Sequence, residues 1–217
     1  MIRNKVALIS SLVILCICLY LYISFPNNGT LEARTIFMSF PIRNHNGYIL
    51  LGIIGSVLFI SAMILLVIGI KKYHFRTLAI VVVVYAFLPK LLITMYQETL
   101  ASGITAISYD GNGTCNFEYV SEDLLDGECN IVLHNRSNEA VSFELEFLDS
   151  SFMEDEVRME SLMNLGGPYR FTIEKNRKKS IHLEKLLELS DVPKHIDSGT
   201  SMNIHFKLID GENIRIL

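Results

Sequence analysis

Cysteines, histidines and clustered acids are the side chains of this chain that are able to do chemistry. Two of the four cysteines, Cys115 and Cys129, fall on the apolar phase of two predicted strands, which residues 121–127 connect. Their sulfur atoms are therefore expected to face the same side of a sheet, where an oxidising compartment would join them in a disulfide. Two buried free thiols are the alternative, because the geometry of the pair is not visible in a sequence.

The other candidates for catalysis or metal binding lack the spacing that such sites need. The six histidines are scattered, and His182 and His205 occupy polar positions of predicted strands, with no two further ligands at zinc spacing. Cys16 and Cys18 lie inside an apolar run without another soft ligand nearby, which favours a role as small apolar fillers. No serine has the Gly-x-Ser-x-Gly context of a nucleophile. We expect neither an enzyme nor a cofactor.

The acidic residues of the second half of the chain form two clusters. These are Glu122, Asp123, Asp126 and Glu128, and then Glu154, Asp155 and Glu156. Their spacing differs from that of an EF-hand loop, and runs of charge are usually solvated. We therefore expect an acidic surface edge and no metal site.

Lys90 is the only charged residue within the long apolar runs of the chain. The preceding Pro89 removes a backbone donor and is expected to kink a helix at this point. Two interpretations remain open. The ammonium group either reaches the lipid headgroups along its flexible stem or meets an acidic residue in the helix of a partner.

Three apolar runs are long enough to span a bilayer, at about residues 6–25, 48–70 and 77–97. The first is longer than the apolar region of a signal peptide and ends in Ile23-Ser24-Phe25-Pro26, so an uncleaved span is expected. Gly52 and Ser56 in the second make a small-xxx-small step that lets another helix approach closely, most simply a span of the same chain. Residues 26–47 are interpreted as a connecting loop.

The distribution of charge predicts the orientation of these spans. Residues 1–101 contain eight Lys and Arg residues and two acidic residues. Residues 102–217 contain eleven Lys and Arg residues and twenty-one acidic residues. The basic residues that fall on one side of the three runs are Arg3, Lys5, Lys71, Lys72 and Arg76, against Arg34 and Arg43 on the other. The positive-inside rule then places the N-terminus in the cytoplasm and residues 102–217 outside. An acidic domain also argues against nucleic acid as a partner.

From Ser102 onward the pattern changes to alternating apolar and polar residues, which is typical of half-buried strands. About seven strands are expected, around residues 115–119, 129–133, 141–147, 171–173, 181–183, 202–208 and 214–216. Asp210-Gly211 predicts the last hairpin, and Leu183–Leu189 is interpreted as a helical turn. We expect an antiparallel β-sandwich of immunoglobulin-like architecture over 102–217, without the tryptophan of antibody domains.

Asn28, Asn112 and Asn135 each begin an Asn-x-Ser/Thr triplet on the predicted outer side, which is compatible with glycosylation. Taken together, the sequence predicts a three-span protein of the cell membrane that carries an acidic extracytoplasmic β-sandwich. The expected role is a non-enzymatic interaction module, in an accessory or regulatory subunit that binds another membrane or extracytoplasmic protein. A subunit of an oligomeric transporter and a ligand-binding sensor are the alternatives.

Overall fold

The structure is a computed structural model that describes residues 2–23, 25, 27, 35–38, 40–44, 47–149 and 157–217. The chain divides into two compact units. The helical unit comprises Met1–Phe25 and Gly29–Thr94, and the β unit comprises Pro26–Asn28 and Met95–Leu217. The second acidic cluster, residues 154–156, lies outside the described residues, as do Arg34 and Asn28.

The helical unit contains α1 (Lys5–Tyr22), α2 (Leu50–Gly69) and most of α3 (His74–Thr99). Helices α2 and α3 are long and apolar enough to cross a membrane, whereas Lys5–Leu21 forms a shorter apolar helix. The Asn4 side chain begins α1, because its Oδ1 accepts hydrogen bonds from the backbone N–H groups of Val6 and Ala7 at 3.0 and 3.2 Å. At the other end Ile23 is already extended, so α1 stops three residues before the predicted end of its apolar run.

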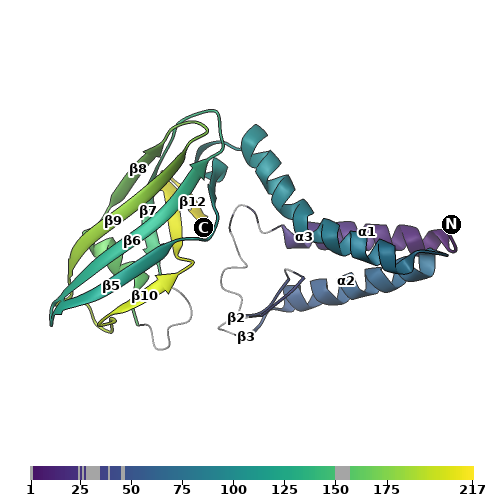
Figure 1. The fold of residues 1–217 in the computed structure, drawn as a ribbon, viewed down its shortest axis with the longest axis horizontal. Coiled ribbons are helices and arrows are strands. Elements are labelled where there is room, and N and C mark those ends of the chain that lie inside the picture. The colour runs from purple at the N-terminus through teal and green to yellow at the C-terminus, as the bar shows by residue number, and fades with distance from the viewer. Residues whose placement is uncertain are drawn as a thin grey trace. The chain divides into compact units, whose positions relative to one another are not determined.

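Helices α1 and α2 lie side by side and antiparallel (Figure 1). The Ser11 hydroxyl donates to the carbonyl of Ala62 at 2.8 Å, and the Cys18 thiol donates to the carbonyl of Gly55 at 3.8 Å. Both side chains are fully buried. Polar groups between apolar helices need such partners, since neither lipid nor aliphatic side chains supply any.

A short antiparallel sheet occupies part of the segment that the sequence suggests is a loop. It consists of β1 (Thr35–Phe37), β2 (Phe40–Asn44) and β3 (Gly47–Tyr48), in that order. Strand β2 packs on α2, where the ring of Phe40 lies over Gly55 and a Cβ added to Gly52 would overlap the Pro41 carbonyl. The two glycines therefore let a strand approach the helix backbone.

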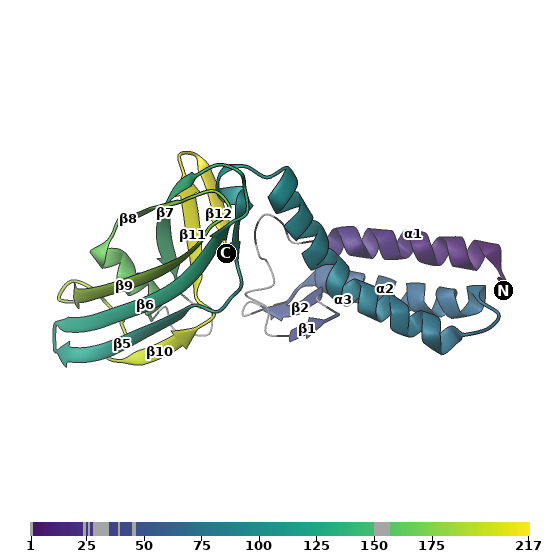
Figure 2. The ribbon, with the colours of Figure 1, turned by 45° about the horizontal axis from the view of Figure 1, so that its top comes forward.

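The β unit consists of two antiparallel sheets (Figure 2). In the first, the strand order is β10-β5-β6-β4, and β9 pairs with the other side of β6; in the second it is β12-β11-β7-β8. The strands are β4 (Ile107–Tyr109), β5 (Thr114–Ser121), β6 (Leu124–Asn135), β7 (Val141–Leu148), β8 (Tyr169–Ile173), β9 (Lys178–Glu188), β10 (Gly199–Met202), β11 (His205–Asp210) and β12 (Asn213–Ile216). Two short 3-10 helices, η1 (Gly103–Ala106) and η2 (Glu160–Gly166), complete the unit.

One hydrophobic core fills the space between the two sheets. Alternate residues of β6 point into it, among them Leu125, Ile131 and Leu133, and they meet Phe143 and Phe147 of β7. The period-two pattern of the sequence is thus confirmed as two antiparallel sheets with buried inner faces.

Two expectations for this half of the chain are wrong. Strand β9 continues to Glu188 in unbroken register with β6, so no helical turn exists at Leu183–Leu189. Inward-facing Leu187 is buried, and pairing along the whole of β6 outweighs the local helical pattern. His205 is also buried, although it occupies a polar position in the sequence pattern of its strand.

Candidate functional site

Lys90 lies on an exposed face of α3. Tyr85 marks the packed face of this helix, since its ring contacts Phe59 at 5.0 Å between centroids and its hydroxyl donates to the carbonyl of Leu15. Lys90 is five residues further on, which places it roughly 140° around the helix from Tyr85. Phe87, one turn before Lys90, is 70% exposed. The exposed face of α3 around Lys90 is therefore apolar.

No carboxylate of the helical unit is available to Lys90 within the described residues. The one acid in the sequence of this unit, Glu32, lies outside them. Among the ion pairs of the described chain none includes Lys90. Pro89 lies inside α3 and is buried, so its ring faces the packed side and leaves Lys90 on the exposed side.

The basic residues that set the predicted orientation are gathered at one end of the helical unit. Ile2 and Ile70 form an antiparallel bridge, and the backbone N–H of Arg3 donates to the carbonyl of Gly69 at 2.8 Å. These contacts hold the N-terminal residues beside the turn from α2 to α3 (Figure 1). We call the exposed cations at this end the basic cluster; they are Arg3, Lys5, Lys71, Lys72 and Arg76.

Gly52 and Ser56 are both buried in α2, but the structure gives them different roles. Gly52 leaves room for Pro41 of β2, whereas the Ser56 hydroxyl donates to the carbonyl of Gly52 in its own helix at 2.8 Å. Helix α1 approaches α2 closely at Gly69, where an added Cβ would lie 2.9 Å from the backbone nitrogen of Leu8.

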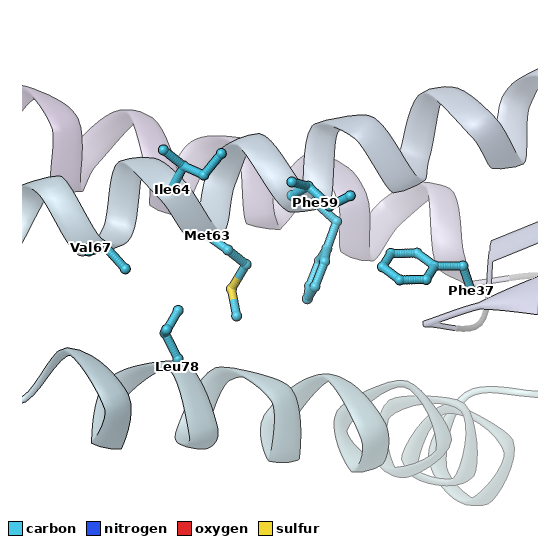
Figure 3. A pocket seen from close by; sticks show the side chains of 7 residues that line it. Phe37, Phe59, Met63, Ile64, Val67 and Leu78 are labelled. Carbon is cyan, nitrogen blue, oxygen red and sulfur yellow. The ribbon is translucent and has the colours of Figure 1, made fainter.

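An apolar groove of about 240 Å³ runs between α2 and α3 (Figure 3). Met63 and Phe59 point from α2 toward α3, and Leu78 points back from α3. The residues that line the groove are Phe37, Phe59, Ile60, Met63, Ile64, Val67 and Leu78. None of them carries a polar side chain, so the groove is suited to a hydrocarbon ligand.

Cys115 and Cys129 are direct partners in the pairing of β5 with β6. Both are fully buried, their Cα atoms are 4.1 Å apart, and their sulfur atoms lie at disulfide distance. The sequence placed the two residues on one face, and the register of the hairpin brings them opposite each other.

The last turn of α3 belongs to the β unit and is held by buried polar side chains. Gln97 is 3% exposed and donates through Nε2 to the carbonyls of Thr105 and Ile107 at 3.2 and 3.1 Å. Arg215 of β12 is 4% exposed and donates to the same two carbonyls and to that of Ile104. Its burial lowers the pKa of the guanidinium to about 10.

A surface ion pair adds to this junction. Arg136 contacts Glu98 of the last turn of α3 at 2.8 Å, and its Nε donates to the Ser108 hydroxyl at 3.0 Å. The sequence did not single out Gln97, Glu98, Arg136 or Arg215. The sequence does not distinguish a polar residue at the end of a span that faces water from one that binds the backbone carbonyls of the following turn.

The outer face of the first sheet bears His182. This imidazole contacts Asn130 at 2.9 Å and lies 3.6 and 3.8 Å from the carboxylates of Glu128 and Glu184. Across the described residues, no three His, Cys, Asp or Glu side chains converge as a metal site would require. Asp123, Asp126 and Glu128 lie at or near the start of β6, along one end of that sheet.

Two of the three glycosylation triplets lie among the described residues, and their asparagines differ in exposure to solvent. Asn112 is exposed in the turn before β5. Asn135 is fully buried, and its Nδ2, the atom that would carry a glycan, donates to the carbonyls of Glu139 and Ile173 at 2.7 and 3.0 Å. The fold therefore leaves no room for a glycan on Asn135.

No protein-family model, curated protein or solved structure matches this chain.

Proposed function

We propose that this chain is a non-enzymatic integral membrane protein that serves as an accessory or regulatory subunit of a membrane complex. In this proposal α1, α2 and α3 all cross the bilayer, with the N-terminus in the cytoplasm. The β unit is an extracytoplasmic β-sandwich of immunoglobulin-like architecture that contacts the outer part of the partner. The basic cluster supports this orientation, since cations concentrate on the cytoplasmic side of a membrane.

The position of Lys90 is the observation that carries the proposal. A lysine at the centre of a spanning helix costs roughly 2.5–3.5 kcal/mol on insertion scales, so it is retained where it has a function. Lys90 lies seven residues before Gln97, which is about 10 Å along the helix. An acid within the membrane part of a partner helix would pair with it there and would make Lys90 the residue that selects the partner.

The proposal includes a defined docking surface, the α3 face around Lys90. Phe87 and Leu91 flank the lysine on this face and are both more than half exposed. A partner helix that packs on Phe87 and Leu91 would bury the ammonium group and exclude water from its ion pair. Pairing inside a low-dielectric interface is worth more than pairing in water, provided that both charges are satisfied.

A photo-crosslinking amino acid at Phe87 of the full chain, expressed in its own cells, tests this docking surface. We expect one protein to be captured reproducibly, through a peptide that contains an acid inside an apolar helix. Lys90→Leu should abolish capture and copurification in mild detergent, whereas Lys90→Arg should retain both. Lys72→Leu, which removes a cation outside the membrane, is the matched control and should leave capture unchanged.

Two results would count against the proposal. If Lys90→Leu accumulates normally and still copurifies with every protein that the wild type binds, Lys90 only reaches the headgroups and selects nothing. If the crosslink joins two copies of this chain, an oligomeric transport assembly replaces the accessory subunit.

A further inference from the structure

The groove between α2 and α3 leads toward the basic cluster. Val67 and Leu78 line the groove and lie four residues before Lys71 and two residues after Arg76. The turn from α2 to α3 therefore places cations next to one end of an apolar groove. In a molecule with an anionic group attached to a hydrocarbon chain, the anionic group would bind the cations and the chain would bind the groove.

The charge of the basic cluster is not balanced by the protein in the described part of the helical unit, which contains no acidic side chain. The bridge between Ile2 and Ile70 adds Arg3 and Lys5 to the three cations of the turn. A basic site between helices on the cytoplasmic side is suited to the headgroup of an anionic lipid.

The extent of the groove distinguishes a lipid chain from a partner helix. On α2 the groove is lined from Phe59 to Val67, which are eight residues or about 12 Å apart, and Phe37 of β1 lines it beyond Phe59. The part of the groove that lies on α2 is less than half of a hydrocarbon core of about 30 Å. A helix that spans the membrane would need a groove through both leaflets, whereas an acyl chain occupies only one.

We propose that one anionic phospholipid of the cytoplasmic leaflet binds here, with its phosphate at Lys71, Lys72 and Arg76 and an acyl chain in the groove. The inference rests on the membrane orientation under Proposed function but is independent of Lys90 and its partner. The bound lipid would fill the space between α2 and α3 and fix the spacing of the two helices. The lipid site lies at the cytoplasmic end of the helical unit, away from Lys90.

Native mass spectrometry of the full chain, released from detergent with added dioleoyl phosphatidylglycerol or dioleoyl phosphatidylcholine, tests the proposal. We expect a single tightly bound phosphatidylglycerol and weaker, graded binding of phosphatidylcholine. Exchange of Lys71, Lys72 and Arg76 for glutamine should reduce the preference about fivefold per cation, or about a hundredfold for all three. Glycerol phosphate, which has the headgroup without the chains, should not compete.

Variants that fill the groove separate specific binding from general attraction to basic residues. Val67→Phe and Leu78→Phe each narrow the groove from one helix and should displace the bound lipid, while Val83→Phe on the exposed face of α3 should not. Retention of the bound phosphatidylglycerol in both groove variants would overturn the proposal, as would equal binding of the two lipids by the wild type. Lys90→Leu should leave lipid binding unchanged, so the failure of one proposal is distinguishable from the failure of the other.

Discussion

Substitution of Asn135 by aspartate should destabilise the β unit far more than an isosteric change usually does. Asn135 ends β6 with its side chain completely buried. Its amide nitrogen donates to the carbonyls of Glu139 and Ile173, and its oxygen accepts from the backbone and hydroxyl of Ser137 at 3.0 and 2.8 Å. The side chain thus connects the turn after β6 with the end of β8.

Asn135→Asp keeps the shape and the acceptor but removes both donors. The buried Ile173 carbonyl then loses this donor, at about 1–3 kcal/mol, while the part-buried Glu139 carbonyl keeps the Ser137 hydroxyl at 3.0 Å, and a carboxylate faces both carbonyls instead of an amide. We expect the free energy of unfolding to fall by about 3–5 kcal/mol, a large share of the roughly 5–15 kcal/mol of a typical domain. The loss should be smaller at pH 4 than at pH 7, because a protonated carboxyl restores one donor.

Guanidinium unfolding of the full chain in detergent, followed by tyrosine fluorescence, measures the effect. Asn112→Asp makes the same chemical change at an exposed turn and should alter the free energy of unfolding by less than about 0.5 kcal/mol. Equal midpoints for the two variants would show that Asn135 does not hold the turn, and the reasoning from its hydrogen bonds would be refuted.

Two further predictions concern the same unit. Closing the loop between Cys115 and Cys129 should contribute roughly 3 kcal/mol, so a reductant should lower the unfolding midpoint of the wild type but not of Cys129→Ser; identical masses after alkylation with and without reductant would exclude the bond. Burial lowers the pKa of His134, and the neighbouring Arg136 and Lys178 lower it further. The pKa of His134 in the folded chain lies below the ordinary value of about 6.5. The free energy of unfolding should therefore be highest above that pH and decrease as the pH falls below it. His134→Gln should remove this dependence, and an unchanged pH profile of the unfolding midpoint would contradict it.

The sequence by itself determined the main type of secondary structure in each unit, helices in the first half and strands in the second, and it placed two cysteines on the same face of a predicted sheet. Long apolar runs predict helices, and alternation of apolar and polar residues predicts strands with one buried face. Each pattern extends over many residues, so a single residue that deviates from it does not change the prediction. The couple Cys115 and Cys129 was also visible, because two strands joined by a short connection form a hairpin with few possible registers.

Only the tertiary structure decided which single polar residues are structural. Asn135 stands among polar turn residues, and Gln97 follows an apolar run, yet both are buried and bind backbone carbonyls outside their own strand or helix. The course of β9 was decided in the same way, by its pairing with β6. The neighbours of these residues come from other parts of the chain, and a linear pattern contains no information about which carbonyl or strand the fold will bring beside them.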